Sequence, residues 1–397
     1  MEPLRRNFRL DLVAGMLGAT FFAGSFMPVL VRRMGGSELE VALVMASGPI
    51  GHILAPLPGY LYARLQPARV VAATNVGARL VFLAGLLVAT SAFSLALAWV
   101  VFNVVALSSI ASATRLVQSI YPDEQRGTAM ARVRMMANLV GMGSTLAGGA
   151  LLSVDDPRLV LALATLVTLV APLPLLFMRY AHVAPAVMLS PVRLGSVALR
   201  DTAFRHYLVA TTFIGFGNAM GGTVYPILLV DKFDAPATLV GLMAATQAAA
   251  TIAGYHFWGR RIDRGSTVVL VRGNALLMTL LPLTYLVAPN ASFLLVGSLV
   301  AGVTAAMMEL AFFTSVIELA GSRADQYMAA QSFVLGVRAT LAPFVACAAM
   351  VAFGPPATLV GVVACLVAGA YLARGMRPAA RTERLARPAL PSEAFAD

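Results

Sequence analysis

The sequence is poor in charge, in lysine and in cysteine. Charged residues make up 12% of the 397 residues, lysine occurs once, at Lys232, and the two cysteines are Cys347 and Cys365. In a soluble domain about a quarter of the residues are charged, so this composition does not suit a water-soluble protein. Both cysteines fall inside apolar runs, where they form neither a disulfide framework nor a metal-ligand spacing. We therefore expect no metal site.

The motifs of several enzyme classes are also missing. No Gly-x-x-x-x-Gly-Lys-Ser/Thr, Gly-x-Ser-x-Gly or His-Glu-x-x-His pattern occurs in the chain. These patterns hold nucleotide phosphates, a serine nucleophile and a zinc ion. We therefore expect no ATP-driven pumping by this chain, no catalytic residues, no enzymatic activity and no cofactor.

Long apolar runs are abundant. Hydrophobic residues make up 59% of the chain, and the mean hydropathy is +0.82. A helix needs about 20 apolar residues to cross the hydrocarbon layer of a bilayer. The runs predict an all-α polytopic membrane protein with twelve transmembrane helices near 12–31, 39–62, 70–92, 95–118, 129–152, 158–178, 206–230, 238–258, 267–288, 293–317, 328–353 and 357–375.

The basic residues are distributed unevenly between the two sides of these helices. The net charge of +11 does not indicate nucleic-acid binding, because the arginines stand singly in short turns. With the N-terminus placed inside, 23 of the 29 basic residues fall in cytoplasmic segments and four in outside turns. Cytoplasmic loops of membrane proteins carry this excess of Arg and Lys. We expect a multi-pass protein of the cell membrane with both termini in the cytoplasm.

The chain repeats its plan after half its length. The turn Gly59-Tyr-Leu-Tyr-Ala-Arg64 recurs 200 residues later as Gly259-Arg-Arg-Ile-Asp-Arg264. Duplicated halves are common in membrane transporters. We expect a six-helix bundle over 1–178, a cytoplasmic central loop over 179–205, a second six-helix bundle over 206–376 and a disordered tail over 377–397. The central loop forms either a short helix along the membrane surface or a plain linker.

These features together resemble the major facilitator superfamily. The resemblance rests on Gly259-x-x-x-Asp263-Arg264 after the eighth span, on the matching ends Pro28–Val31 and Pro226–Val230, and on Pro122–Gly127 between the fourth and fifth spans. It covers the chain from Arg9 to Arg374 and implies two pseudo-symmetric bundles that move solutes by alternating access. Proton-driven drug exporters of this family usually have an arginine early in the fourth span, where this chain has Asn103.

The resemblance also implies a conformational latch at the cytoplasmic turns. Asp263 would face the N-terminus of the fifth span, where exposed N–H groups favour an anion, and Arg264 would approach Glu318. Gly59 and Arg64 would take the corresponding places in the first half, where Ala63 replaces the carboxylate. The alternative is that these charges only fix the topology from a solvated loop.

Three ionisable residues fall near the middle of predicted spans: Glu309, Arg338 and His52. Such residues are costly in a membrane and are functional candidates. Glu309 and Arg338 would form a buried ion pair, or Glu309 would carry the coupling proton or bind a cationic substrate. His52 is either a neutral histidine bonded to a backbone carbonyl or a proton carrier.

Uncharged polar residues in the spans are candidate substrate contacts. They are Asn103, Ser108, Asn218, Tyr225 and Gln247. Each could instead hydrogen-bond to a neighbouring helix.

The sequence thus predicts a secondary active transporter for a small organic solute, coupled to protons as a symporter or an efflux antiporter. Its partners would be membrane lipids, the small-molecule substrate and protons, with no nucleic acid, and we expect a monomer. Two alternatives stay open: a lipid or lysolipid flippase of the same fold, and a non-transporting partner in a membrane assembly.

Overall fold

The computed structural model describes residues 2–55, 62, 64–154, 156–180, 201–264, 266–320 and 324–376. These residues form helices and turns, with no strand among them. The helices of the first half are α1 (Glu2–Ala19), α2 (Ala23–Arg33), α3 (Glu38–Leu54), α5 (Pro67–Val88), α6 (Ala92–Leu107), α7 (Ile110–Ile120), α8 (Asp123–Val154), α9 (Pro157–Thr168) and η1 (Leu173–Phe177).

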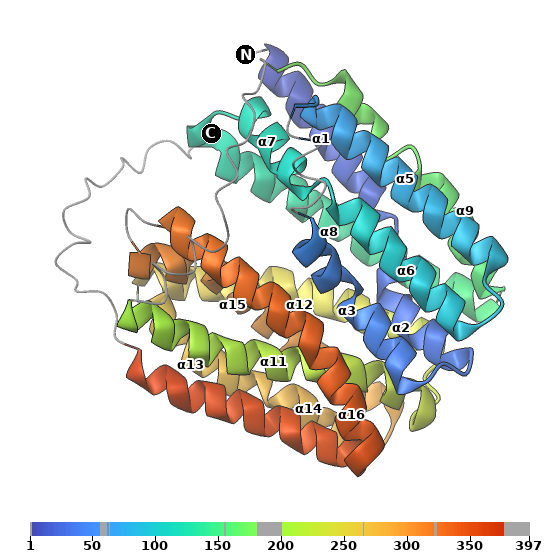
Figure 1. The fold of residues 1–397 in the computed structure, drawn as a ribbon, viewed down its shortest axis with the longest axis vertical. Helices are drawn as coiled ribbons and strands as arrows, with labels where there is room; N and C mark the ends of the chain where they lie inside the picture. Colours follow the sequence, from blue (N-terminus) through green and yellow to red (C-terminus); the bar gives the residue numbers. More distant parts are fainter. Residues whose placement is uncertain are drawn as a thin grey trace.

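The second half has the same kind of helices. They are α11 (Thr202–Asp231), α12 (Ala237–Arg264), α13 (Thr267–Met278), α14 (Leu280–Val287), η2 (Ala291–Phe293), α15 (Leu294–Ala320), α16 (Ala324–Leu372) and η4 (Ala373–Gly375). Figure 1 shows the first half in blue to green and the second in yellow-green to red, as two bundles that meet along α2, α3, α8, α11, α12 and α16.

The twelve predicted spans are all represented among the described residues. Ten helical stretches are long and apolar enough to cross a membrane. One of them, Ala330–Gly375, holds two spans, because the backbone bends at Gly354 (φ +80°) before Pro355 and Pro356. The shorter α3 supplies the remaining span.

Some spans are broken where the sequence gives no breaker. The first span is divided at Thr20–Phe22 into α1 and α2, although its only proline, Pro28, lies inside α2. The aromatic ring of Phe21 instead packs against those of Phe82, Trp99 and Phe102, with centroids 5.3 to 6.2 Å away. Aromatic packing on the first half therefore accompanies the break.

The molecule has two different ends. The first is called the Arg32 end, because α2 stops there at Arg33; the last residues of α8 and α11 and the first residues of α3, α12 and α15 also lie there. The opposite one is called the terminal end, because the first residue of α1 and the last residue of η4 lie there. Helix α11 begins at Thr202, four residues before the predicted start of the second bundle at 206, and the domain bounds stay a prediction. Most of the central loop, the tail from 377 and the turn residues Gly59 and Ala63 lie outside the described residues.

Candidate functional site

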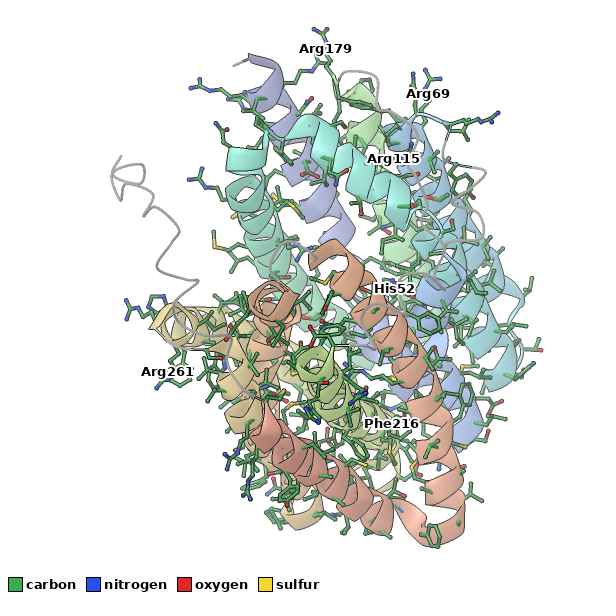
Figure 2. All side chains as sticks on the ribbon, turned by 60° about the vertical axis from the view of Figure 1, so that its left-hand side comes forward. His52, Arg69, Arg115, Arg179, Phe216 and Arg261 are labelled. Carbon is green, nitrogen blue, oxygen red and sulfur yellow. The ribbon has the colours of Figure 1, made fainter. Side chains whose placement is uncertain are left out.

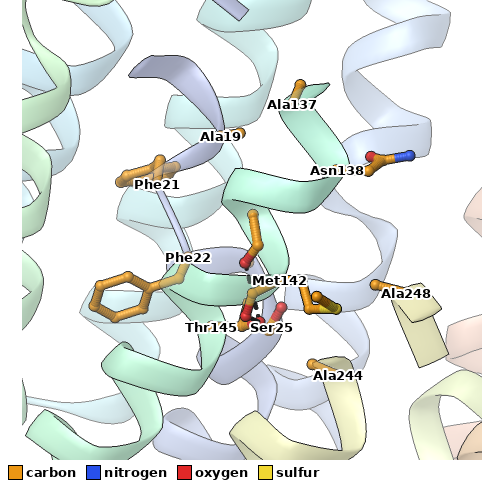
Figure 3. A pocket seen from close by; sticks show the side chains of 12 residues that line it. Ala19, Phe21, Phe22, Ser25, Ala137, Asn138, Met142, Thr145, Ala244 and Ala248 are labelled. Atoms are coloured by element: carbon orange, nitrogen blue, oxygen red, sulfur yellow. Dashed lines mark hydrogen bonds between the residues drawn. The ribbon is translucent and has the colours of Figure 1, made fainter. Parts of the chain in front are cut away.

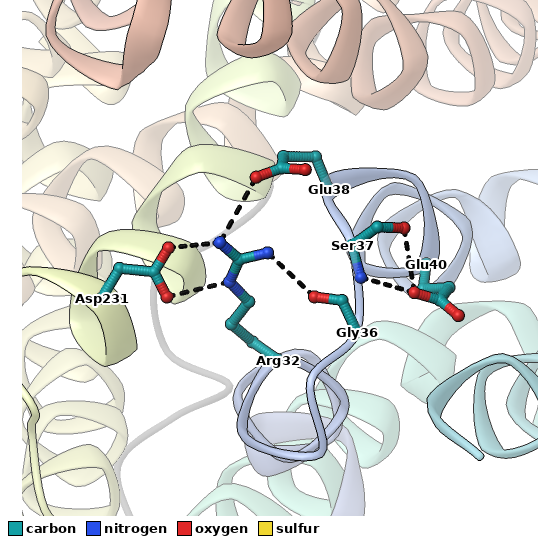
Figure 4. Close-up of polar contacts among 6 residues, drawn as sticks. All are labelled: Arg32, Gly36, Ser37, Glu38, Glu40 and Asp231. Atoms are coloured by element: carbon teal, nitrogen blue, oxygen red, sulfur yellow. Dashed lines mark hydrogen bonds and ion pairs between the residues drawn. The ribbon is translucent and has the colours of Figure 1, made fainter.

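The two halves are tied together at the Arg32 end by a charged cluster. Arg32, in the last turn of α2, donates from Nε to Oδ1 of Asp231, 2.9 Å away, and bonds the second carboxylate oxygen as well. The same guanidinium reaches the carbonyl of Gly36 at 2.8 Å and Glu38 at 3.3 Å. Figure 4 shows this arrangement, in which one arginine of the first half is held by a carboxylate of each half. The two-point pairing of a guanidinium with a carboxylate is strong and directional.

Further contacts cross between the halves at this end. Arg33 donates to the carbonyl of Ala235, and the backbone N–H of Thr238 donates to Oγ of Ser153 at 3.2 Å. The hydrogen bonds described between the two halves all belong to the Arg32 end.

Two glycines let the backbones of α8 and α12 touch. A Cβ added at Gly149 would lie 2.7 Å from the carbonyl oxygen of Ala237, and one at Gly241 would lie 2.6 Å from that of Thr145. Small residues allow this closeness in membranes. The Arg32 end is therefore closed by packing as well as by charge.

A cavity of about 350 Å³ lies beside this closed end, at the break between α1 and α2. Figure 3 shows that its walls come from three segments: the α1–α2 break, α8 and α12. Its lining is mostly small and apolar, with polar groups from Ser25, Asn138 and Thr145. Thr145 donates to carbonyls of its own helix. None of the candidate residues from the sequence lines this cavity, since no charge or motif marks its walls.

Glu309 is exposed on α15 and accepts a hydrogen bond from the hydroxyl of Tyr255 on α12. Arg134 of α8 lies within electrostatic range of the same Tyr255 hydroxyl. Helix rise places these three residues at one level, each about 14 to 17 Å from the terminal end of its helix. A bonded carboxylate and phenol of the second half thus lie at the level of a guanidinium of the first half. No motif or mid-span charge in the sequence points to Tyr255 or Arg134 as functional residues.

Arg338 lies on α16 and reaches across to α11. Its Nη1 donates to the carbonyl of Thr211, and its guanidinium covers Gly215 so closely that an added Cβ there would overlap it. In this conformation Arg338 and Glu309 bind different partners, so the alternative that they form an ion pair stays a prediction. The ion pairs that the structure describes are those of Arg32 with Glu38 and Asp231.

His52 is exposed near the end of α3. Figure 2 shows it between the two halves of the molecule. Within the part of the chain that the structure describes, its ring makes no hydrogen bond to a backbone carbonyl. The position is open to a proton or a ligand, and its role stays a prediction.

The five polar candidates differ in their surroundings. Asn103 donates to the carbonyl of Trp99 at 2.9 Å, and Ser108 to that of Val105 at 2.6 Å, so both are satisfied within their own span. Asn218 and Gln247 are exposed on α11 and α12. Tyr225 stacks on Tyr285, with ring centroids 4.4 Å apart. Asn103 and Tyr225 are partly exposed, and Asn218 and Gln247 are the most exposed of the five.

The proposed latch is described only in part. Glu318 accepts from Oγ of Ser266 at 2.5 Å and from the backbone N–H of Thr267 at 3.0 Å, so it caps the N-terminus of α13. Gly259 lies in α12, and Arg64 is exposed in its turn. The side chains of Asp263 and Arg264 lie outside the described residues, so their pairing stays a prediction.

Basic side chains gather at the terminal end. Figure 2 shows Arg69, Arg115 and Arg179 at that end of the first half and Arg261 at that end of the second. The Arg32 end carries Arg32, Arg33, Arg158 and Lys232. No group of three or more His, Cys, Asp or Glu within the described residues could hold a metal ion.

Comparison with solved structures finds the same fold in known transporters. A mutant form of the nucleoside transporter NupG matches with a TM-score of 0.76 and 11% identity over 93% of this chain and 99% of that one. A bacterial homolog of the human lysosomal transporter Spinster matches with a TM-score of 0.65 and 14% identity, over 94% and 95%. The human organic anion transporter MFSD10 matches with a TM-score of 0.64 and 17% identity, over 94% and 99%.

Among curated protein sequences, none matches this chain. The model of the Major Facilitator Superfamily matches residues 12–206 and 207–395, which is nearly the whole sequence in two consecutive parts. The chain therefore belongs to the major facilitator superfamily.

Proposed function

We propose that the protein is a secondary active transporter that moves a small organic solute across the cell membrane by alternating access. The observation that carries this proposal is the uneven distribution of contacts between the halves. Hydrogen bonds, an ion pair and a glycine crossing join them at the Arg32 end, while a cavity lies beside the joined region. Rocking of one bundle against the other would open this end and close the terminal end.

The terminal end is assigned to the cytoplasm. Its excess of arginine supports this side, because basic residues are retained on the cytoplasmic face. Both termini would then be cytoplasmic, and the structure would represent the state that is closed to the outside. The Asp263 and Arg264 latch would form when the cytoplasmic end closes.

Glu309 is the residue proposed to carry the coupling proton. Its carboxylate is accessible and bonded to the hydroxyl of Tyr255, so it can exchange a proton with water on the open side. Arg134 of the other half would pair with the deprotonated carboxylate when the cytoplasmic ends of α8 and α15 approach. Protonation would then weaken closure, which couples proton movement to the conformational cycle.

Transport by purified protein in liposomes tests the proposal. Radiolabelled organic solutes would be added with and without an imposed proton gradient, and accumulation would be measured. We expect one solute class to accumulate with the gradient. Glu309→Gln should lower gradient-driven accumulation at least tenfold while solute exchange without a gradient continues. Equal gradient-driven uptake by the variant would remove Glu309 from the coupling step.

The apolar lining of the cavity supports a second candidate, a lipid substrate. The walls at Phe21, Phe22 and Met142 offer apolar surface with few polar groups. The similar solved structures include a nucleoside transporter and an organic anion transporter. Their sequence identities to this chain, 11% and 17%, are too low to indicate its substrate. Fluorescent lipid transfer between leaflets, without solute uptake, would favour the lipid candidate. Absence of both activities would favour a non-transporting partner in an assembly.

A further inference from the structure

Arg338 is a charged residue at the middle of a membrane-spanning helix. It follows the first residue of α16 by 14 positions and precedes the bend at Gly354 by 16. With a rise of 1.5 Å per residue, it stands about 20 Å or more from both ends of this straight segment. A guanidinium at such depth is costly unless another group compensates its charge.

The contacts of Arg338 leave most of its hydrogen-bonding capacity available. A guanidinium has five N–H donors, and the structure describes one bond, from Nη1 to the Thr211 carbonyl. Among the described residues no carboxylate pairs with it. The side chain is partly exposed, so a ligand can reach it.

The guanidinium lies on the face of α11 that is directed toward the first half. It covers Gly215, and Gly222 lies seven residues later, two turns along the same face. A Cβ added at Gly222 would lie 3.2 Å from the methyl carbon of Met45 in α3, a helix of the first half. Asn218 lies between the two glycines and is exposed. Asn218 follows Gly215 by three residues, so it lies about one turn from the guanidinium on the same side of α11.

We propose that Arg338 and Asn218 form a binding subsite for the carboxylate of an organic acid, which makes organic anions the substrate class of this transporter. The inference rests on the proposed transport function. The planar guanidinium matches the two oxygens of a carboxylate, and the Asn218 amide supplies a further N–H donor. No carboxylate of the described residues pairs with Arg338, so the substrate would supply the negative charge that compensates the guanidinium. Gly215 is required because any side chain there would displace the guanidinium.

Binding of matched acid and amide pairs to the purified full-length protein tests this subsite. The probes are benzoate with benzamide, 3-phenylpropionate with 3-phenylpropionamide, and octanoate with octanamide. Binding is followed by the shift in thermal unfolding midpoint and by the fluorescence of Trp99 and Trp258. We expect the dissociation constant of at least one acid to be at least tenfold lower than that of its amide. Arg338→Gln should abolish that difference. Arg338→Lys should retain part of it, since the charge stays without the two-point geometry.

A glycine pair supplies the matched control. Gly215→Ala keeps the charge but displaces the guanidinium, so it should weaken acid binding as Arg338→Gln does. Gly361→Ala on α16 should leave it unchanged, because no atom lies within 4 Å of the added Cβ. The subsite is refuted if amides bind as well as acids, if Arg338→Gln keeps the preference, or if no acid binds at millimolar concentration.

Liposome uptake separates this inference from the proposed function. Uptake of neutral or cationic solutes but not of acids would leave transport standing and overturn the subsite. Arg338-dependent binding of acids without movement of any solute would retain the subsite and overturn transport.

Discussion

At the scale of the residue, ionisable side chains inside the spans are hydrogen-bonded to uncharged groups. Glu309 is bonded by a tyrosine of the neighbouring span, and Asp11 accepts from Tyr121 at 2.7 Å in the same way. Arg79 and Arg338 each donate to a backbone carbonyl, that of Asn75 and that of Thr211. The carboxylate–guanidinium pairs that the structure describes lie at the Arg32 end. Inside the spans, these charged side chains are therefore stabilised by hydrogen bonds to uncharged groups.

Glu318 gives a prediction about a single residue. It accepts from Ser266 and from the backbone of Thr267 at the start of α13, where a carboxylate satisfies free N–H groups and favours the helix dipole. Glu318→Gln should lower the free energy of unfolding by about 1 kcal/mol, measured by chemical unfolding in detergent. Ser266→Ala should have a smaller effect in the same direction. An unchanged free energy of unfolding in both variants would contradict the capping role of Glu318. The predicted pairing with Arg264 would then be the remaining role for this carboxylate.

At the scale of the helix, the sequence identifies the spans well and their breaks poorly. Apolar length and the position of arginines predict where each span lies, because both are local properties. The break at Thr20–Phe22 has no local signal, since it accompanies packing of Phe21 on rings from α5 and α6. Phe22 likewise occupies the space that Gly148 of α8 leaves free. Such positions depend on contacts between residues far apart in the sequence.

The crossing of α8 and α12 gives a prediction for this pair of helices. Gly241→Leu would force its Cβ within 2.6 Å of the Thr145 carbonyl, so the closed Arg32 end should no longer pack. We expect the efficiency of a short cross-linker between Ser153→Cys and Thr238→Cys, placed in a chain without Cys347 and Cys365, to fall severalfold. Gly143→Leu is the control, because its Cβ meets no atom within 4 Å. Equal cross-linking in both variants would show that the crossing does not hold this end closed.

At the scale of the whole molecule, the duplicated plan brings distant charges together. Arg32 follows Pro28 at the end of the first span, and Asp231 follows Pro226 at the end of the seventh, so the repeat places them at corresponding ends of the two bundles. From the sequence, Arg32 is one of the four basic residues of the outside turns, and no partner is predicted for it. The repeat relates the first span to the seventh, so it could have identified the pair of Arg32 and Asp231. Arg134 and Tyr255 lie in the fifth and eighth spans, which do not correspond in the repeat, so it offers no signal for them.

The ion pair at the Arg32 end should bias the conformational equilibrium of the whole molecule. Arg32→Ala removes bonds to Asp231 and Glu38, and the half-exposed setting limits their contribution to about 1 kcal/mol. That value corresponds to about a fivefold change in the ratio of closed to open molecules. Distances between spin labels on α2 and α11, measured by double electron–electron resonance, should show a larger population with this end open.

Two comparison variants make the test specific to the pair. Arg32→Asp combined with Asp231→Arg should restore much of the closed population, because the charges are exchanged in place. Arg158→Ala should change nothing, since Arg158 is exposed at the same end. Identical distance distributions in Arg32→Ala and the unmodified protein would contradict this role. They would mean that glycine packing closes this end and that the bonds of Arg32 only stabilise the end of α2 and the start of α3.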